Sequence, residues 1–476
     1  MSLENEMASQ PNRILKTARH PANAGASGSL FYRHAFVSSG RPLCFGLCVL
    51  LLLWMAAAFF AAPILAAEAF LIKAGTVHTV TQGDLSPGEV LVRDGQIAAV
   101  GKNLDLRDAK VIDLSGAHVY PGLIAPTSSL GLVEIGAVRA TQDMSEVGEY
   151  TPDVQSWIAV NPDSEHLPVA RANGITHALA VPQGGIVSGT SGLIALDGWT
   201  AEDMAIRKLV GLHLFWPSMQ LDTTPKERFT DKSRWKSLED QANDRRKKLK
   251  SLNDFFEEAK AYSRARESGK LTAITPAWEA MLPVIKGQIP IFVHADEIKQ
   301  IKAAVLWASE QGYKIILAGG RDAHMAATLL AEKKVPVIFE QVFDQPSRDR
   351  QAYDIHFKTP ALLHQAGVRV ALSQGLGSSA ASHTRNLPYA AAQAVAFGFP
   401  AEEALKSLTL YPAEMLGVTN RLGSIEPGKE ASLFAATGDI LDIRSRVTRL
   451  WIAGKEVSLD TRHTRLYEKY RNRPAR

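Results

Sequence analysis

The fold is decided by residues 289–340, which read IPIFVHADEIKQIKAAVLWASEQGYKIILAGGRDAHMAATLLAEKKVPVIFE. Three short apolar runs occupy positions 289–295, 313–319 and 335–340. The stretches between them place apolar residues three and four positions apart, as amphipathic helices do, and each ends at a glycine or a lysine pair. Buried apolar strands that alternate with helices form parallel β-α units. This segment therefore predicts an α/β fold with a parallel sheet covered by helices.

The same alternation extends over residues 119–417. Further candidate strands are GITHALAV (174–181), LVGLHLF (209–215) and VRVALSQ (368–374). A region of about 300 residues built from β-α units fits a (β/α)8 barrel. A doubly wound open sheet is the alternative, but no G-x-G-x-x-G motif follows the first strand. We expect GGIVSGTSGLIALDG (184–198) to be a hairpin inserted into the barrel.

Both flanks of this region are rich in short strands. Residues 70–118 and 418–462 alternate apolar and polar positions between Asp-Gly, Pro-Gly and Ala-Gly turns. Neither flank has enough strands to bury its apolar face alone, so we expect one small β-sandwich formed by the two together. A charged helical insertion is predicted near 225–270, where interleaved acids and bases indicate a solvated helix face. A basic tail, 463–476, ends the chain.

The N-terminal region, residues 1–69, has the pattern of a signal peptide or signal anchor. Basic residues precede an uncharged run at 42–67, and the small residues Ala67 and Ala69 fit an A-x-A cleavage site. The run is also long enough to span a bilayer, so it serves as a membrane anchor if it is not cleaved. In both versions the excess of positive charge before the run directs the body out of the cytoplasm. The sequence therefore predicts an exported, periplasmic or extracytoplasmic protein.

Composition excludes several classes of protein. The net charge of +4 over 476 residues gives no electrostatic basis for binding nucleic acid. The chain has two cysteines, Cys44 and Cys48, which lie in the same apolar run. A disulfide framework, a cysteine metal cluster and a thiol nucleophile in the body of the protein are therefore excluded.

Three motifs resemble the entry and exit segments of the amidohydrolase superfamily, in particular its imidazolonepropionase-like branch. They are VRDGQIAAVG (92–101), VIDLSGAHVYPGLIAPTSSLGL (111–132) and SLTLYPAEMLGVTNRLGSIEPGKEASLFAATGD (407–439). The resemblance covers residues 70–460. It implies a TIM-type barrel with the active site at the carboxyl ends of its strands. It also implies hydrolysis of carbon–nitrogen bonds other than peptide bonds, in small amides or cyclic amides, by water that divalent metals activate.

The metal ligands that the resemblance implies are mostly replaced. An H-x-H pair should follow the first strand, single histidines should end the fifth and sixth, and an aspartate should end the eighth. His294 stands at the fifth-strand position. The other positions carry residues that are poor ligands for a transition metal: Thr127, Ser129, Gly319 and Gly375. We therefore expect a degenerate site that binds no cofactor, or binds a zinc-type divalent metal weakly through His294.

Polar residues at the strand ends are the candidates for a substrate pocket: His294, Asp296, His213 and Gln374. A rewired metal cluster that adds Glu297, Asp322 and His324 is an alternative, although such residues at strand–helix junctions commonly cap helices. The sequence predicts an exported amidohydrolase-like hydrolase with a degenerate metal site. The alternative is a non-catalytic relative whose barrel mouth binds a ligand or a partner.

Overall fold

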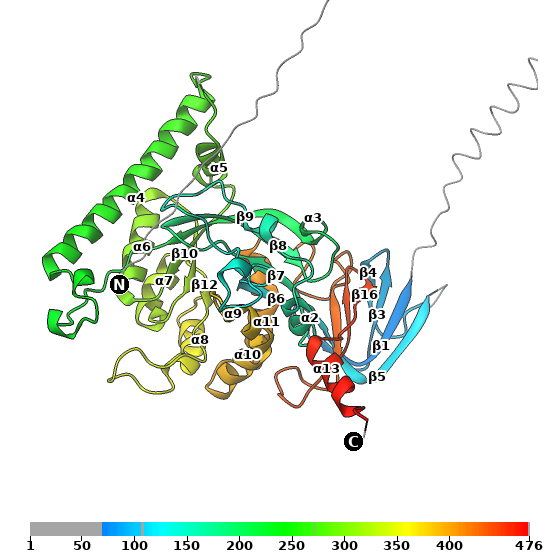
Figure 1. Ribbon diagram of the computed structural model, residues 1–476. Helices are drawn as coiled ribbons and strands as arrows, with labels where there is room; N and C mark the ends of the chain where they lie inside the picture. The colour runs from blue at the N-terminus through cyan, green and yellow to red at the C-terminus, as the bar shows by residue number, and fades with distance from the viewer. Residues whose placement is uncertain (1–68, 106–108, 272, 475–476) are drawn as a thin grey trace, which may run out of the picture. The chain divides into compact units, whose positions relative to one another are not determined.

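A computed structural model describes residues 69–105, 109–271 and 273–474, which belong to one compact unit (Figure 1). The predicted signal or anchor segment, 42–67, lies outside the described residues. Within the described ranges, no helix combines the length and the apolar character that a bilayer span requires.

One eight-stranded sheet forms a nearly closed barrel. Its spatial order is β13-β12-β11-β10-β9-β8-β7-β6. The edge strands β6 and β13 meet through their ends, where the Ser373 hydroxyl donates to the Thr127 carbonyl at 2.8 Å. The barrel strands are β6 (Leu123–Ser128), β7 (Ile175–Ala180), β8 (Val187–Ala195), β9 (Ala205–Phe215), β10 (Ile291–Ala295), β11 (Ile315–Gly319), β12 (Val337–Phe339) and β13 (Val370–Leu372). All six apolar runs predicted as strands are confirmed.

The predicted inserted hairpin is wrong, because residues 187–195 form strand β8 of the barrel itself. This strand runs antiparallel to both of its neighbours, whereas all other neighbouring pairs in the sheet are parallel. The connection from β7 to β8 spans only residues 181–186, which is too short for a crossover helix, so the chain must return antiparallel. The architecture fits a TIM-type barrel with one reversed strand.

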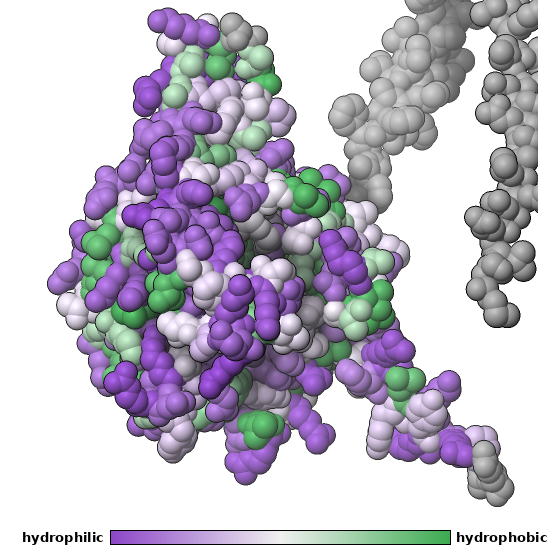
Figure 2. Space-filling model, turned by 60° about the vertical axis from the view of Figure 1, so that its left-hand side comes forward, coloured by the Kyte–Doolittle hydropathy of each residue, from purple (hydrophilic) through white to green (hydrophobic). Residues whose placement is uncertain are grey.

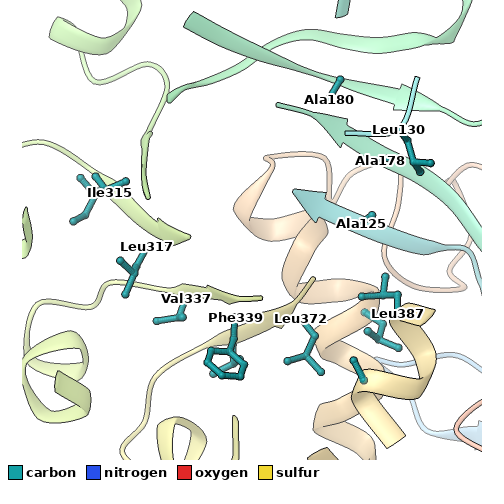
Figure 3. Packing of buried hydrophobic residues seen from close by; sticks show 14 of the residues in the cluster. Ala125, Leu130, Ala178, Ala180, Ile315, Leu317, Val337, Phe339, Leu372 and Leu387 are labelled. Carbon is teal, nitrogen blue, oxygen red and sulfur yellow. The ribbon is translucent and has the colours of Figure 1, made fainter. Parts of the chain in front are cut away.

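Alternate side chains of the barrel strands enter two separate apolar clusters. Ile316, Ile338 and Ala371 pack inside the barrel, together with residues of helix α12 (Leu410–Met415) such as Ala413. Their sequence neighbours pack outward against the surrounding helices, and Figure 3 labels four of them: Leu317, Val337, Phe339 and Leu372. This alternation fixes which side chains at the strand ends point into the barrel mouth.

Most of the helices cover the outside of the barrel, while α13 lies beside the second sheet (Figure 1). Their bounds are α2 (His166–Arg171), α3 (Ala201–Met204), α4 (Leu238–Glu267), α5 (Pro276–Ile285), α6 (Ile298–Gln311), α7 (Ala327–Glu332), α8 (Ile355–Gln365), α9 (Ala380–His383), α10 (Leu387–Ala396), α11 (Ala401–Leu408), α12 (Leu410–Met415) and α13 (Arg462–Arg471). The predicted charged insertion contains α4, which packs Phe256 against Trp307, with the ring centroids 5.0 Å apart. Figure 2 brings the side of the molecule that carries α4 forward, and the surface seen there is largely hydrophilic. The basic tail overlaps α13, in which no residue is buried.

The second sheet combines the two flanks of the barrel. Its order is β16-β15-β14-β5-β1-β3-β4, with β2 paired to β1. Strand β14 pairs antiparallel with β5, so that Phe434 lies opposite Tyr120. The strands are β1 (Phe70–His78), β2 (Asp84–Leu85), β3 (Gly88–Arg93), β4 (Gln96–Gly101), β5 (Lys110–Pro121), β14 (Leu433–Ala436), β15 (Val447–Ile452) and β16 (Lys455–Glu456). The flanks therefore share one sheet, while the two-layered sandwich stays a prediction.

Candidate active site at the barrel mouth

A cavity of about 490 Å³ opens at the carboxyl ends of the barrel strands. Of the predicted pocket residues, His294, Asp296 and Gln374 line this cavity. His213 is fully buried and does not line it, because it lies behind His294. The rest of the wall comes from Phe215, Trp216, Ala295, Gln300, Ala318, Gly319, Glu340, Gln341, Asp344, Gly375 and Leu376.

His294 and His213 form a hydrogen-bonded pair of neutral imidazoles. The His213 Nδ1 and His294 Nε2 atoms are 2.9 Å apart. The His294 ring also stacks on Phe215, with centroids 4.1 Å apart and planes inclined by 7°. Burial lowers the pKa of His294 to about 3, and burial together with the neighbouring His294 holds the pKa of His213 well below its ordinary value. Near neutral pH neither ring is charged.

The hydrogen bonds of this pair indicate where each ring carries its proton. Nε2 of His213 is buried without a partner. A buried N–H group without an acceptor costs more free energy than a buried ring nitrogen without a donor. The proton of His213 therefore belongs on Nδ1, from which it is donated to His294 Nε2. His294 then carries its own proton on Nδ1, which makes no hydrogen bond within the described chain. His294 thus presents an N–H donor to the cavity.

Glu340 is the residue that the sequence analysis missed. It directly follows β12 and continues the inward alternation of Ile338, so its side chain reaches the barrel mouth. Burial raises the pKa of Glu340 to about 8, and the nearby carboxylates of Asp296 and Asp344 add to the effect. The signal that would have found it is a single acidic residue closing the apolar run VPVIFE (335–340).

The hydroxyl group of Thr127 opposes this effect of burial. Thr127 Oγ1 lies 2.5 Å from Glu340 Oε1 and 2.9 Å from Ser373 Oγ. The hydrogen of Ser373 is donated to the Thr127 carbonyl at 2.8 Å. The hydrogen bond that Thr127 donates to Glu340 lowers the pKa of the carboxyl, but burial raises this pKa by more. These contacts tie Glu340 to β6 and to the residue that follows β13.

The residues at the expected metal-ligand positions do not fit a metal. Thr127 is engaged with Glu340, and the hydroxyl of Ser129 accepts hydrogen bonds from Gln183 Nε2 and the Gly377 amide, each at 3.2 Å. Gly319 has φ +91°, and a Cβ atom there would lie 2.8 Å from Asp296 Oδ1. In the part of the chain that the structure describes, no three His, Cys, Asp or Glu side chains are grouped so that they could hold a metal ion.

Asp296 lies beside Gly319, the expected position of the sixth-strand ligand. Its carboxylate pairs with Arg321 at 3.3 Å and accepts hydrogen bonds from the Arg321 amide at 3.2 Å and Gln341 Nε2 at 3.3 Å. A Cβ atom at the expected aspartate position, Gly375, would lie 3.3 Å from Glu340 Oε2. A larger side chain at Gly319 or Gly375 would therefore require Asp296 or Glu340 to move.

The residues of the alternative rewired cluster have structural contacts. Glu297 is the N-cap of α6 and forms a capping box with Gln300. Asp322 accepts from the Ile298 amide at 3.0 Å and forms a two-pronged ion pair with Arg348. His324 Nδ1 lies 3.5 Å from the Thr359 hydroxyl. These contacts agree with the capping interpretation of the strand–helix junctions.

A second cavity, of about 1100 Å³, shares the Glu340, Asp344 and Gln374 side chains with the first. Its far wall is formed by α10 and by the loop 439–443, which connects β14 to β15 in the second sheet. The candidate site is therefore built from the barrel and the C-terminal flank together.

A barrel with a cavity at the carboxyl ends of its strands has the general architecture of barrel enzymes. The model of the Amidohydrolase family matches residues 203–457, which is over half of the chain. The chain belongs to this family, and its fold and cavity are hydrolase-like.

Individual relatives agree with this assignment. An amidohydrolase from Thermotoga maritima MSB8 has a similar structure, with a TM-score of 0.72, 29% identity, and coverage of 82% of this chain and 99% of that one. The amidohydrolase tasK of Hapsidospora irregularis is 21% identical over 409 residues, which are 77% of this chain and 39% of that protein. The D-hydantoinase of Geobacillus stearothermophilus is 44% identical over 78 residues, 16% of each chain. The chain thus spans well under two thirds of the length of these two curated relatives.

Proposed function

We propose that the protein is an exported hydrolase of carbon–nitrogen bonds other than peptide bonds, from the imidazolonepropionase-like branch, which works without the metal centre of its family. The observation that carries the proposal is Glu340, an enclosed carboxyl with a pKa of about 8 that lines the barrel-mouth cavity. A carboxyl that stays protonated near neutral pH is suited to act as a general acid.

The surrounding side chains can supply the remaining parts of a hydrolysis. Asp344 lines the same cavity, and its carboxylate has no hydrogen bond or ion pair with any described residue. It can accept a proton from water as the water attacks the carbonyl carbon, and the N–H of His294 can donate to the carbonyl oxygen. Glu340 then donates its proton to the leaving nitrogen as the carbon–nitrogen bond breaks. The different surroundings of the two carboxyl groups thus allow Glu340 to act as the acid and Asp344 as the base.

The substrates that we propose are small amides or cyclic amides. Support comes from the family and from the D-hydantoinase among the relatives. The second candidate is a non-catalytic relative that binds a ligand at the same place. It is favoured by the replacement of four expected ligand positions, Thr127, Ser129, Gly319 and Gly375.

The test combines elemental analysis of the purified full-length chain with assays on hydantoin and on linear anilides. We expect less than about one tenth of an equivalent of zinc, manganese or iron, since a strong zinc site needs about four ligands. Hydrolysis should persist with a chelator and fall by about 10²–10⁴ in Glu340→Gln, the usual range for loss of a general acid. Glu332→Gln, on the exposed surface of α7, is the matched control.

Two results would decide against the proposal. About one equivalent of metal that is lost in His294→Ala would show that a metal site survives. Binding of the anilides without any release of aniline would favour the non-catalytic candidate.

Export is a separate part of the proposal. It rests on the uncharged run 42–67 and on the small residues that end it. Mass spectrometry should find the mature chain beginning near Phe70, or find residues 42–67 retained in the membrane fraction. Full-length chain that is soluble in the cytoplasm would contradict both versions.

A further inference from the structure

The two cavities share Glu340, Asp344 and Gln374 and have an uneven distribution of charge. Of the described residues that line either cavity, none is a lysine or an arginine. Five carry carboxyl groups: Asp296, Glu340, Asp344, Asp439 and Asp442. A wall of this kind favours positive charge in a ligand and repels negative charge.

Three of the five carboxyl groups are already compensated. Asp296 pairs with Arg321 at 3.3 Å, and Asp442 pairs with Arg444 at 2.6 Å. Glu340 is enclosed at the barrel mouth, where burial favours its neutral form, and it accepts a hydrogen bond from Thr127. The two that remain, Asp344 and Asp439, form no ion pair with a lysine or an arginine within the described ranges. They lie on the wall of the larger cavity.

The loop that carries Asp439 is held in place before any ligand binds. The Ile440 amide donates to the Tyr120 hydroxyl at 3.2 Å, and the Leu441 amide donates to Asp439 Oδ1 at 2.9 Å. Tyr120 is itself buried and stacks on Phe434, with ring centroids 5.2 Å apart. The position of the Asp439 carboxylate is therefore fixed by β5 and β14, and a ligand does not need to order it.

Apolar side chains lie beside both unpaired carboxylates. Phe343, next to Asp344, is 48% exposed, and Ile443 in the 439–443 loop is 74% exposed. Tyr389, Val395 and Leu441 complete an apolar wall. Large apolar side chains that are exposed in a cavity are a common feature of ligand sites.

We propose that the site selects amides that carry a cationic amino group and an apolar group, with the amide at Glu340 and Asp344 and the amino group toward Asp439. The inference rests on the proposed function for the placement of the amide, whereas the charge preference rests on the wall of the larger cavity. Anionic amides should be excluded, because the wall offers them no cationic group in exchange for lost hydration.

Three anilides of equal chain length test this inference, ending in an ammonium, a methyl or a carboxylate group. Binding to the full-length chain is measured by titration calorimetry at about pH 7.5, where alkyl ammonium and carboxylate groups are both charged. The ammonium compound should bind about tenfold more tightly than the carboxylate compound, and the difference should shrink at high salt. Equal binding of the two charged compounds, or tighter binding of the carboxylate, would overturn the inference.

Asp439→Asn should bring the ammonium and methyl compounds to within about twofold of each other, since Asn keeps the Oδ1 acceptor for the Leu441 amide while losing the charge. Asp163→Asn, at an exposed aspartate that lines neither cavity, should leave the preference unchanged. Release of aniline is recorded in parallel. Loss of hydrolysis with the charge preference intact refutes only the proposed function, and hydrolysis without the preference refutes only this inference.

Discussion

Replacing Glu340 by glutamine should change the pH dependence of stability more than stability itself. The side-chain carbonyl of glutamine can accept from the Thr127 hydroxyl as Glu340 Oε1 does, so it preserves the hydrogen bonds around Thr127 and Ser373. At about pH 5.5 the variant should therefore unfold within about 1 kcal/mol of the wild type.

The magnitude at higher pH follows from the raised pKa. Burial moves the pKa of Glu340 from 4.5 to about 8, so the native state binds a proton that the unfolded state has released between these values. Stability is full below the lower value and falls by about 1.4 kcal/mol per pH unit until the upper value is reached. From about pH 5.5 to pH 8 the full effect is roughly 3 kcal/mol, and solvent in the cavity reduces it to about 1–2 kcal/mol. The free energy of unfolding of the glutamine variant should not show this decrease, because glutamine does not titrate.

Urea unfolding at about pH 5.5 and pH 8.5 measures the difference in the free energy of unfolding between the wild type and Glu340→Gln. The contributions of all other titrating groups cancel in this difference. The glutamine variant should become more stable than the wild type as the pH rises, and Glu332→Gln should show no such trend. A constant difference at both pH values would refute the reasoning, because it would mean that Glu340 is ionised throughout.

Two further predictions concern packing. Gly319→Ala should lower the free energy of unfolding by about 2–4 kcal/mol, because residue 319 has φ +91° and the added Cβ atom would lie 2.8 Å from Asp296 Oδ1. The control Gly287→Ala, where φ is +66° and the added Cβ atom meets open space, should lower it by about 1–2 kcal/mol in the same denaturation assay. Deleting every residue from Leu422 onward removes β14, the partner of β5, and should leave insoluble or unfolded chain; a truncated protein with an unchanged melting temperature would contradict the shared sheet.

Much of the architecture could be predicted from local patterns. The apolar runs at 289–295, 313–319 and 335–340 are strands because a buried parallel strand needs an uninterrupted apolar sequence whatever its neighbours are. The pairing of the two flanks followed from a similar argument about unburied apolar faces. The reversed strand β8 was missed because direction depends on the length of the connection and on the partner strands, which the sequence of 184–198 does not specify.

For the candidate site too, some features follow from the sequence and others only from the tertiary structure. The sequence by itself determined that His294 stands at a strand end, and it predicts that Thr127, Ser129, Gly319 and Gly375 occupy the expected ligand positions. Only the tertiary structure decided that Glu340 meets Thr127 across 213 residues, and that Asp296 lies where a side chain at Gly319 would stand. The physical reason is that the protonation of a carboxyl is set by burial and by partners from other strands, and closure of the barrel alone brings those partners together.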